Sequence, residues 1–364
     1  MQVFYLEQNI PFLAELLSPF GKIVNFSGRE LTNPCLIEDN CTALFVRSTT
    51  IVNEELLKGT SVAFVATATT GTDHVDTEYL SSKNIVFSSA FGSNANSVAE
   101  YVLYSMLKWA DEYKFMLKNK ILGIVGFGNI GSRLAYYASK LEMKILVNDP
   151  PLKEMNFAFP DYVEYCSLED LARHSDIFTN HVPLTKTGNY PTEMLINGEL
   201  LNLLRDGSLL IHTSRGGVLD EAGLLSRISA GDIDAVIDVW ENEPLVSKPL
   251  AESAFIATAH IAGYSYDGKV QGAVQIAKDY LASQGSSLPS NSIDKMLNNE
   301  TKLSFGCYSN QEQLLSSLKK SRDIDSDSVN YKNTLMLSSS ERANAFDQLR
   351  KNYPIRREIL TPFV

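Results

Sequence analysis

The sequence predicts an α/β protein built on parallel sheets, with more than one domain. Three observations lead to this prediction. Short apolar runs alternate with amphipathic stretches over about the first 285 residues, which is typical of strands joined by crossover helices. A glycine-rich turn, Gly126-Phe127-Gly128-Asn129-Ile130-Gly131, follows one of these runs and precedes a helical stretch. The chain of 364 residues is also longer than one ordinary domain.

The first expected domain comprises residues 1–95 and a returning helix within 267–285. Its sheet is expected from five apolar runs, each followed by a polar turn and an amphipathic stretch. A helix over residues 267–283 crosses back to this domain, which makes the domain discontinuous. The expected strands are residues 1–6, 22–26, 43–46, 62–66 and 85–88.

The second expected domain comprises residues 96–266. Ser97 and Glu100 have the spacing of a capping box, which predicts a helix that begins at Ser97 and continues to Leu117. Another series of apolar runs then predicts a second parallel sheet. The expected strands are residues 121–125, 144–148, 177–180, 208–212 and 235–239.

Residues 286–364 are expected to form a small appended α+β domain, with a disordered tail as the alternative. Residues 283–292 are rich in Ser, Gly, Pro and Asn, as linkers are. Two helices are expected beyond them, at 311–321 and 340–351.

Composition excludes several classes of function. The formal net charge of −11 argues against nucleic-acid binding, which depends on clustered Lys and Arg. No apolar run approaches the roughly 18 residues that a membrane helix needs, and residues 1–6 lack the basic flank of a signal peptide. We therefore expect a cytoplasmic protein. Its four cysteines are scattered, so we expect them to be reduced thiols and expect no metal site.

The glycine turn has the context of a dinucleotide site. The glycines permit a tight turn, close approach of the backbone to a pyrophosphate, and helix–strand contact, while the helix expected to open at Ser132 offers an N-terminus that attracts the anion. Asp149 ends the next strand, where a carboxylate accepts hydrogen bonds from ribose hydroxyls and disfavours a 2′-phosphate. Both domains are thus expected to be Rossmann-like and doubly wound, and NAD is preferred over NADP. A solvated turn residue is the alternative for Asp149.

Three ionisable residues follow strands of the second sheet. Arg215 lies in Thr213-Ser214-Arg215-Gly216-Gly217, where a guanidinium can clamp a carboxylate. His260 follows the last apolar run and has the ordinary properties of a general base. Glu243 is the carboxylate expected to fix the histidine tautomer. The set predicts oxidation of a 2-hydroxy acid. A structural ion pair for Arg215 and a structural His260 are the alternatives.

These motifs resemble those of the D-2-hydroxyacid dehydrogenases. The resemblance rests on the glycine turn, Ser214-Arg215-Gly216, the segment from Asp238 to Pro244, and His260. It implies that Arg215 and Glu243 are catalytic and that His260 is the proton acceptor or donor. Val182 stands where a threonine often helps to hold NAD, which puts one cofactor contact in doubt. The implied NAD contacts are Gly126, Gly128, Asn129, Ile130, Gly131, Asp149, Val182, Asp238 and Gly263.

A narrower match within that family implies a phosphorylated 2-hydroxy acid as the substrate. Ser48 and Thr69 of the first domain and Tyr264, which follows His260 in the sequence, match substrate-binding positions. Arg47 ends a first-domain strand and is a candidate phosphate or carboxylate contact, or else a surface arginine. The resemblance also implies a homodimer formed through residues 286–364. The alternatives are another NAD-dependent enzyme of the family and a non-catalytic NAD-sensing protein.

Overall fold

The structure, a computed structural model, describes residues 2–288, 308 and 310–360. The expected linker at 283–292 lies partly outside these residues. The chain divides into two compact units. Unit 1 contains residues 1–94 and 265–300, and unit 2 contains residues 95–264 and 301–364.

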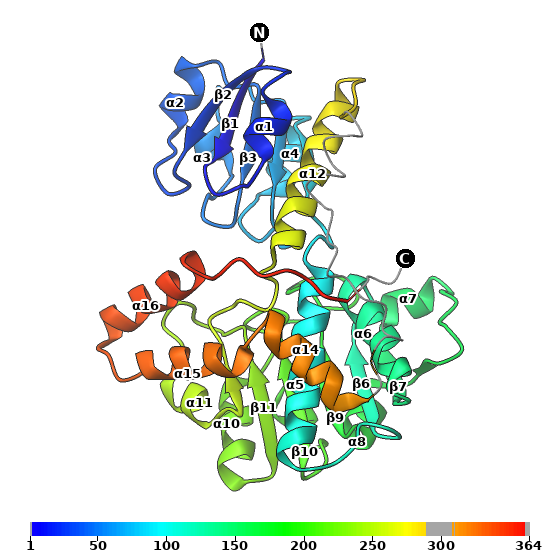
Figure 1. Cartoon of the computed structure of the whole chain (residues 1–364). Helices are drawn as coiled ribbons and strands as arrows, with labels where there is room; N and C mark the ends of the chain where they lie inside the picture. Colours follow the sequence, from blue (N-terminus) through cyan, green and yellow to red (C-terminus); the bar gives the residue numbers. More distant parts are fainter. Residues whose placement is uncertain (1, 289–307, 309, 361–364) are drawn as a thin grey trace. The chain divides into compact units, whose positions relative to one another are not determined.

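Unit 1 is a five-stranded parallel sheet with the order β2-β1-β3-β4-β5, covered by helices on both faces (Figure 1). The helices α1 and α12 pack on one face, and the short helices α2, α3 and α4 pack on the other. The central strands are buried along their whole length, which explains their continuous apolar sequence. The elements are β1 (Val3–Glu7), α1 (Leu13–Leu17), β2 (Lys22–Phe26), α2 (Asn33–Glu38), β3 (Ala43–Val46), α3 (Glu54–Leu57), β4 (Phe64–Thr67), α4 (Thr77–Ser82), β5 (Val86–Ser89) and α12 (Tyr266–Ser283).

Unit 2 contains a seven-stranded parallel sheet with the order β12-β11-β10-β9-β6-β7-β8. The chain leaves β6 toward β7 and later returns on the other side of β6 as β9, so the strand order reverses there. In open α/β sheets this reversal marks the place where ligands bind, beyond the carboxyl ends of the strands. The strands are β6 (Ile121–Val125), β7 (Lys144–Asn148), β8 (Glu164–Tyr165), β9 (Ile177–Asn180), β10 (Ser208–His212), β11 (Ile233–Ile237) and β12 (Ile256–Ala257).

Helices cover both faces of this sheet. Successive strand side chains point to opposite faces: Ile124 packs with α5 and α6, whereas Val125 packs with α8, α9, α10 and α11. Both faces are therefore apolar, which accounts for the strong strand signal in the sequence. The helices are α5 (Ala95–Glu112), α6 (Asn129–Lys140), α7 (Pro150–Glu154), α8 (Leu168–His174), α9 (Gly198–Leu201), α10 (Glu221–Ala230) and α11 (Lys248–Ser253).

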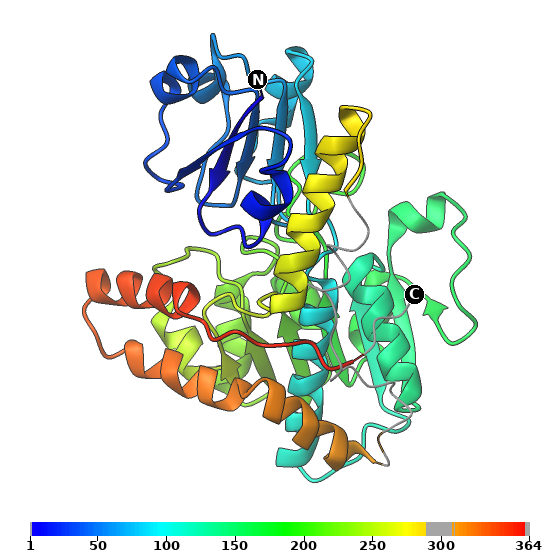
Figure 2. The same ribbon diagram turned by 45° about the horizontal axis from the view of Figure 1, so that its top comes forward.

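The described part of the C-terminal segment is helical and packs on unit 2. Helix α14 (Gln311–Ser321) lies along α5, and α15 (Ile324–Thr334) packs beside β12 (Figures 1 and 2). The helix α16 (Ser339–Lys351) follows. Two of these helices agree with the predicted ranges, and α15 was not predicted. In the described residues the expected α+β domain thus appears as three helices. No helix among the described residues is long and apolar enough to span a membrane.

The predicted capping box at Ser97 is wrong. Helix α5 begins at Ala95 and ends at Glu112, so Ser97 and Glu100 lie inside it. Ser97 Oγ donates a hydrogen bond to the carbonyl oxygen of Ala262 instead. The Glu100 carboxylate accepts from the N–H groups of Ile359 and Leu360. Tertiary partners have taken the two side chains that would otherwise cap a helix.

Candidate active site and nucleotide site

The glycine turn connects β6 to α6. A Cβ at Gly131 would lie 2.1 Å from the carbonyl oxygen of Gly126, so this contact admits only glycine. Gly126 has a φ of +88°, which also favours glycine. At Gly128, in contrast, no described atom lies within 4 Å of the Cβ position. Two glycines thus shape the turn, and Gly128 keeps the backbone open to a ligand.

Helix α6 presents its N-terminus to the same turn. Its N-cap is Gly128, and no side chain caps it. Asn129 and Ile130 form its first turn, where backbone N–H groups and the helix dipole favour an anion. The local structure therefore fits the pyrophosphate of a dinucleotide.

Asp149 ties the end of β7 to the glycine turn. Its Oδ2 accepts from the Phe127 N–H at 2.8 Å, and its Oδ1 accepts from the Leu152 N–H at 3.1 Å. The second bond caps α7. Asp149 is therefore an ordered residue rather than a solvated turn residue. Each carboxylate oxygen has a further lone pair that can accept from a ribose hydroxyl.

His181 and Val182 follow β9, and the buried His212 lies in β10. Val182 Cγ1 lies 3.0 Å from the Cβ position of Gly126, so Val182 borders the glycine turn through an apolar contact. Burial lowers the pKa of His181 to about 3 and that of His212 to about 4. Both imidazoles are therefore neutral at pH 7.

His260 and Glu243 form a hydrogen-bonded pair. The Glu243 carboxylate accepts from His260 Nδ1, with oxygen distances of 2.8 and 3.0 Å. This bond places the proton on Nδ1 and leaves Nε2 as the nitrogen that can accept a proton. The side chains of His260 and Glu243 are 29% and 20% exposed, so a small molecule can reach the pair.

The pKa of Glu243 is lowered. Burial acts to raise it, but the charge and hydrogen bond of His260, the N–H of Trp240 and the guanidinium of Arg350 outweigh burial. Glu243 is therefore a carboxylate at neutral pH. It can both fix the histidine tautomer and stabilise the imidazolium.

Asp238 builds the loop that carries His260. Its side chain is 1% exposed. Oδ1 accepts from the Ile261 N–H at 2.7 Å and from Thr258 Oγ1 at 2.6 Å, and Oδ2 accepts from the Ala262 N–H at 2.9 Å. The Asp238 carbonyl accepts from the His260 N–H. His260 has a φ of +55°, an uncommon conformation for histidine, and these bonds hold it there.

Gly263 and Tyr264 complete the histidine loop, residues 258–264. The Tyr264 N–H closes a turn by donating to the Ile261 carbonyl. The Tyr264 ring packs edge-on against Tyr353 of the C-terminal segment, with ring centroids 5.7 Å apart. Both Asp238 and Tyr264 thus have structural contacts beyond any ligand.

Arg215 lies in the loop after β10. Its Nη1 donates to the Ser214 carbonyl at 2.8 Å, which bends the side chain back over its own loop. A Cβ at Gly216 would lie 2.1 Å from the Trp240 carbonyl oxygen, so this glycine lets the arginine loop pack tightly against the segment that leads to Glu243. Arg215, Glu243 and His260 all come from loops at the carboxyl ends of neighbouring strands, β10, β11 and β12.

The remaining predicted residues belong to unit 1. Arg47 and Ser48 follow β3, and Thr69 follows the neighbouring strand β4, so all three lie at the carboxyl edge of that sheet. Thr69 Oγ1 contacts the Thr67 hydroxyl at 2.8 Å and the carbonyl of Gly71 at 2.9 Å. The hydroxyl is thereby held in one orientation.

Sequence reasoning missed two arginines of the C-terminal segment. Arg322 donates to the carbonyls of Ser97, Ile261 and Tyr264. Arg350 lies 4.0 Å from Glu243 Oε2. Neither arginine belongs to a motif in the sequence.

Residues 96–262 match the family described as D-isomer specific 2-hydroxyacid dehydrogenase, NAD binding domain. An erythronate-4-phosphate dehydrogenase from Photorhabdus laumondii subsp. laumondii is 40% identical over 354 residues, which cover 97% of this chain and 92% of the relative.

Two solved structures share the fold. The apo D-mandelate dehydrogenase of Rhodotorula graminis has a TM-score of 0.66 at 24% identity, and covers 79% of this chain and 96% of its own. The D-lactate dehydrogenase of Aquifex aeolicus, complexed with NAD and lactic acid, has a TM-score of 0.62 at 26% identity, with 78% and 96% covered. Each leaves about a fifth of this chain unmatched.

Proposed function

The chain belongs to the erythronate-4-phosphate dehydrogenases, a branch of the D-2-hydroxyacid dehydrogenases, and on this premise we propose that it oxidises 4-phospho-D-erythronate with NAD. The product is 2-oxo-3-hydroxy-4-phosphobutanoate. This reaction belongs to pyridoxal 5′-phosphate biosynthesis. The observation that carries the proposal is the His260–Glu243 pair, because alcohol oxidation needs a base for the hydroxyl proton.

NAD is the proposed cofactor, and when bound it accepts the hydride from C2 of the substrate. The glycine turn fits it, since Gly128 leaves its Cβ position open and α6 has no side-chain cap. Asp149 would accept from the ribose hydroxyls and repel a 2′-phosphate. Val182 supplies only an apolar surface. Asp238 and Gly263 are the remaining proposed NAD contacts.

The residues of unit 2 divide the proton chemistry among them. His260 Nε2 accepts the proton of the C2 hydroxyl while the hydride leaves C2, and the resulting imidazolium is stabilised by Glu243. Arg215 binds the substrate carboxylate and polarises the neighbouring oxygen. The lowered pKa of Glu243 keeps this carboxylate ionised during the step. The substrate would thus lose one proton to His260 and one hydride to the cofactor.

We assign four further residues to the substrate. Ser48, Thr69 and Tyr264 would bind its hydroxyl and carboxylate oxygens, and Arg47 would bind its phosphate or carboxylate. Thr69 supports this assignment through its fixed hydroxyl. A phosphate is bound by basic groups, and unit 1 has a second one, Lys269, whose pKa is lowered by burial and by the charge of Arg47.

A homodimer formed through residues 286–364 and a cytoplasmic location also belong to this proposal. Residues 1–95 with 267–285 would bind substrate, and residues 96–266 would bind NAD. Sedimentation equilibrium of the full chain tests the dimer, and the mass of a monomer at all concentrations would overturn it.

The activity is tested by mixing the purified protein with NAD and 4-phosphoerythronate, with a 2-oxo acid present as a possible hydride acceptor. Turnover is expected. Activity on lactate or 3-phosphoglycerate alone would overturn the substrate assignment. His260→Ala is expected to reduce kcat by about 10²–10⁴ while NAD affinity is kept; an unchanged kcat removes His260 as the base.

A further inference from the structure

The C-terminal segment contacts the histidine loop from its far side. Arg322, at the end of α14, is 5% exposed and donates to the carbonyl oxygens of Ile261 and Tyr264 at 2.8 and 2.9 Å. It also donates to the carbonyl and hydroxyl of Ser97 at 2.8 and 3.2 Å. One buried guanidinium therefore joins the histidine loop to α5. Its loss would leave buried carbonyls without this donor.

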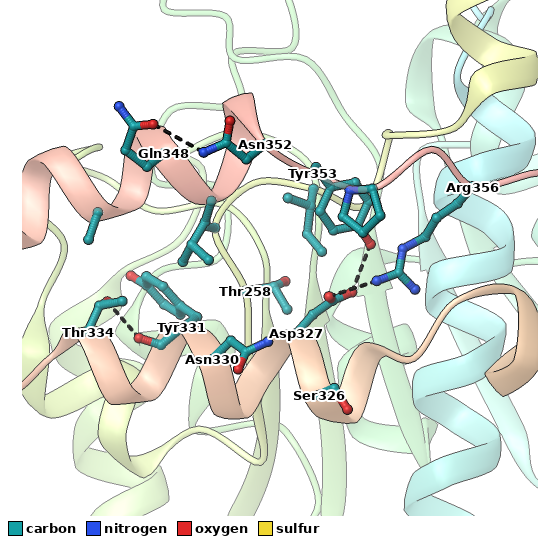
Figure 3. A pocket seen from close by; sticks show the side chains of 15 residues that line it. Thr258, Ser326, Asp327, Asn330, Tyr331, Thr334, Gln348, Asn352, Tyr353 and Arg356 are labelled. Carbon is teal, nitrogen blue, oxygen red and sulfur yellow. Dashed lines mark hydrogen bonds and ion pairs between the residues drawn. The ribbon is translucent and has the colours of Figure 1, made fainter.

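A second set of polar contacts joins α15 to the chain beyond α16. Asp327 accepts from the Tyr353 hydroxyl at 2.8 Å and from Arg356 Nη2 at 2.9 Å (Figure 3). Between α15, α16 and the histidine loop lies a pocket of about 490 Å³, lined on the loop side by Thr258 and Ile261. The space behind the histidine loop is therefore incompletely packed. Because of this, the contact of α16 with the His260–Glu243 pair depends on particular polar side chains.

Arg350 is the side chain of α16 that reaches the catalytic pair. Its guanidinium lies 4.0 Å from Glu243 Oε2, and its side chain is 25% exposed. The Arg350 guanidinium also interacts favourably with the Tyr264 side chain. A guanidinium has several donors in a fixed plane, so it can hold two oxygen acceptors at once. Arg350 thus links the partner of His260 to a residue of the histidine loop.

We propose that Arg350 is a positioning residue of the active site, which holds the Glu243 carboxylate on His260 and fixes Tyr264 from the C-terminal segment. The inference rests on the proposed function of the His260–Glu243 pair. It gives the C-terminal segment a part in the reaction that is separate from any part in assembly. The two solved structures above leave a fifth of this chain unmatched, whereas the Photorhabdus relative covers 97% of it.

The charge of Arg350 has a direction of effect that can be measured. A cation beside Glu243 favours the ionised carboxylate and opposes addition of a proton to the coupled pair. Removal of that cation makes the pair bind a proton more readily, so the acid limb of the rate profile moves to higher pH. The other titratable or charged groups that act on Glu243 or Arg350 are His212 of β10, Glu221 of α10, Tyr331 of α15, and Asp238 and Tyr264.

The side chains of those neighbouring groups are not altered when only Arg350 is substituted. Burial lowers the pKa of His212 to about 4, and burial raises the pKa values of Glu221 and Tyr331. His212 and Tyr331 are consequently neutral at pH 7. A shift on loss of Arg350 therefore reports Arg350 itself.

The test compares Arg350→Met, Arg350→Lys and the matched control Lys351→Met in the full chain. Lys351 is exposed and adjacent on the same helix, so its substitution removes the same charge without touching the pair. Two experiments are made. The first measures kcat and KM with 4-phosphoerythronate from pH 5.5 to 9, and the second measures the midpoint of the proton titration followed at the His260 ring by NMR without substrate.

Arg350→Met is expected to move both the acid limb and the NMR midpoint upward by about half to one pH unit. It should also lower kcat/KM by about tenfold or more, because Tyr264 loses its anchor. Arg350→Lys should keep the limb but raise KM, since an ammonium lacks the planar fork. Lys351→Met should match the wild type in every measurement.

A folded Arg350→Met protein with unchanged midpoint and limb overturns the proposal, and so does an equal shift in Lys351→Met. If Arg350→Met does not fold, Arg350→Lys decides, and an unchanged KM overturns the proposal. A wild-type protein without turnover refutes the proposed function instead. The NMR comparison still tests Arg350 in that case, because it needs no substrate.

Discussion

Asp238 offers a sharp test of how the active site is built. The substitution Asp238→Asn preserves size and removes one acceptor. If the amide nitrogen takes the place of Oδ2, it faces the Ala262 N–H, which is left without an acceptor from this side chain. If it takes the place of Oδ1, it faces the Ile261 N–H. One buried donor is therefore orphaned in either orientation.

The cost follows from these contacts. An orphaned buried N–H costs about 1–3 kcal/mol, and a bond to a neutral acceptor is about 1 kcal/mol weaker than one to a charged acceptor. Relief from burying the Asp238 charge offsets part of this. The net local cost is about 1–3 kcal/mol. At about 1.4 kcal/mol per factor of ten, local opening of the histidine loop becomes about 5- to 150-fold more frequent.

Hydrogen exchange of a peptide covering residues 256–264, followed by mass spectrometry, measures this opening. Asp234→Asn is the matched control, since Asp234 lies on β11, the strand that Asp238 follows, and accepts from the Trp109 indole N–H, which an amide oxygen also satisfies. Unchanged protection in Asp238→Asn would refute the reasoning. Equal loss of protection in both variants would refute it as well.

The remaining predictions concern the glycine turn and the catalytic carboxylate. Gly131→Ala places a Cβ 2.1 Å from a backbone oxygen, so thermal unfolding should show a lower Tm and calorimetry weaker NAD binding. Gly128→Ala should keep the Tm but weaken NAD binding at least tenfold, and normal affinity would argue against a cofactor there. Glu243→Gln should lower kcat by about 10²–10⁴, because an amide N–H can donate to His260 Nδ1 and select the wrong tautomer. The pKa of Glu243 is lowered in the fold, so the carboxylate is ionised at neutral pH and wild-type activity should hold there, and activity should fall in acid as the His260–Glu243 pair takes up a proton. Stopped-flow NADH formation across pH checks both statements.

The α/β fold was predictable because its strands are buried on both faces. Such strands give continuous apolar runs that need no tertiary information to detect. The runs at Ile121–Val125 and Ser208–His212 coincide with β6 and β10. The run predicted for residues 235–239 is displaced, since β11 ends at Ile237. Asp238 is instead occupied with the histidine loop, and a side chain with that role leaves no signal in the strand pattern.

The pairing of His260 with Glu243 was predictable for a related reason. Carboxyl ends of neighbouring parallel strands meet at one edge of a sheet, so residues that follow β11 and β12 converge. The positive φ of His260 was not predictable, because it is imposed by bonds from Asp238. Arg322 and Arg350 were also missed. They lie in a segment of weak periodicity, and their partners are distant in sequence.

The failed capping box and the missed arginines have one physical cause. Ser97 accepts a hydrogen bond from Arg322, and Glu100 accepts from the N–H groups of Ile359 and Leu360. The pattern Ser97-x-x-Glu100 therefore docks the C-terminal segment. Burial and the nearby Glu358 raise the pKa of Glu100 in this docked position. A local motif was therefore present in the sequence, but its donors come from a segment more than 200 residues away. The same docking brings Arg350 to Glu243. Release of the C-terminal segment would therefore remove the contacts of Ser97 and Glu100 together with the contact between Arg350 and Glu243.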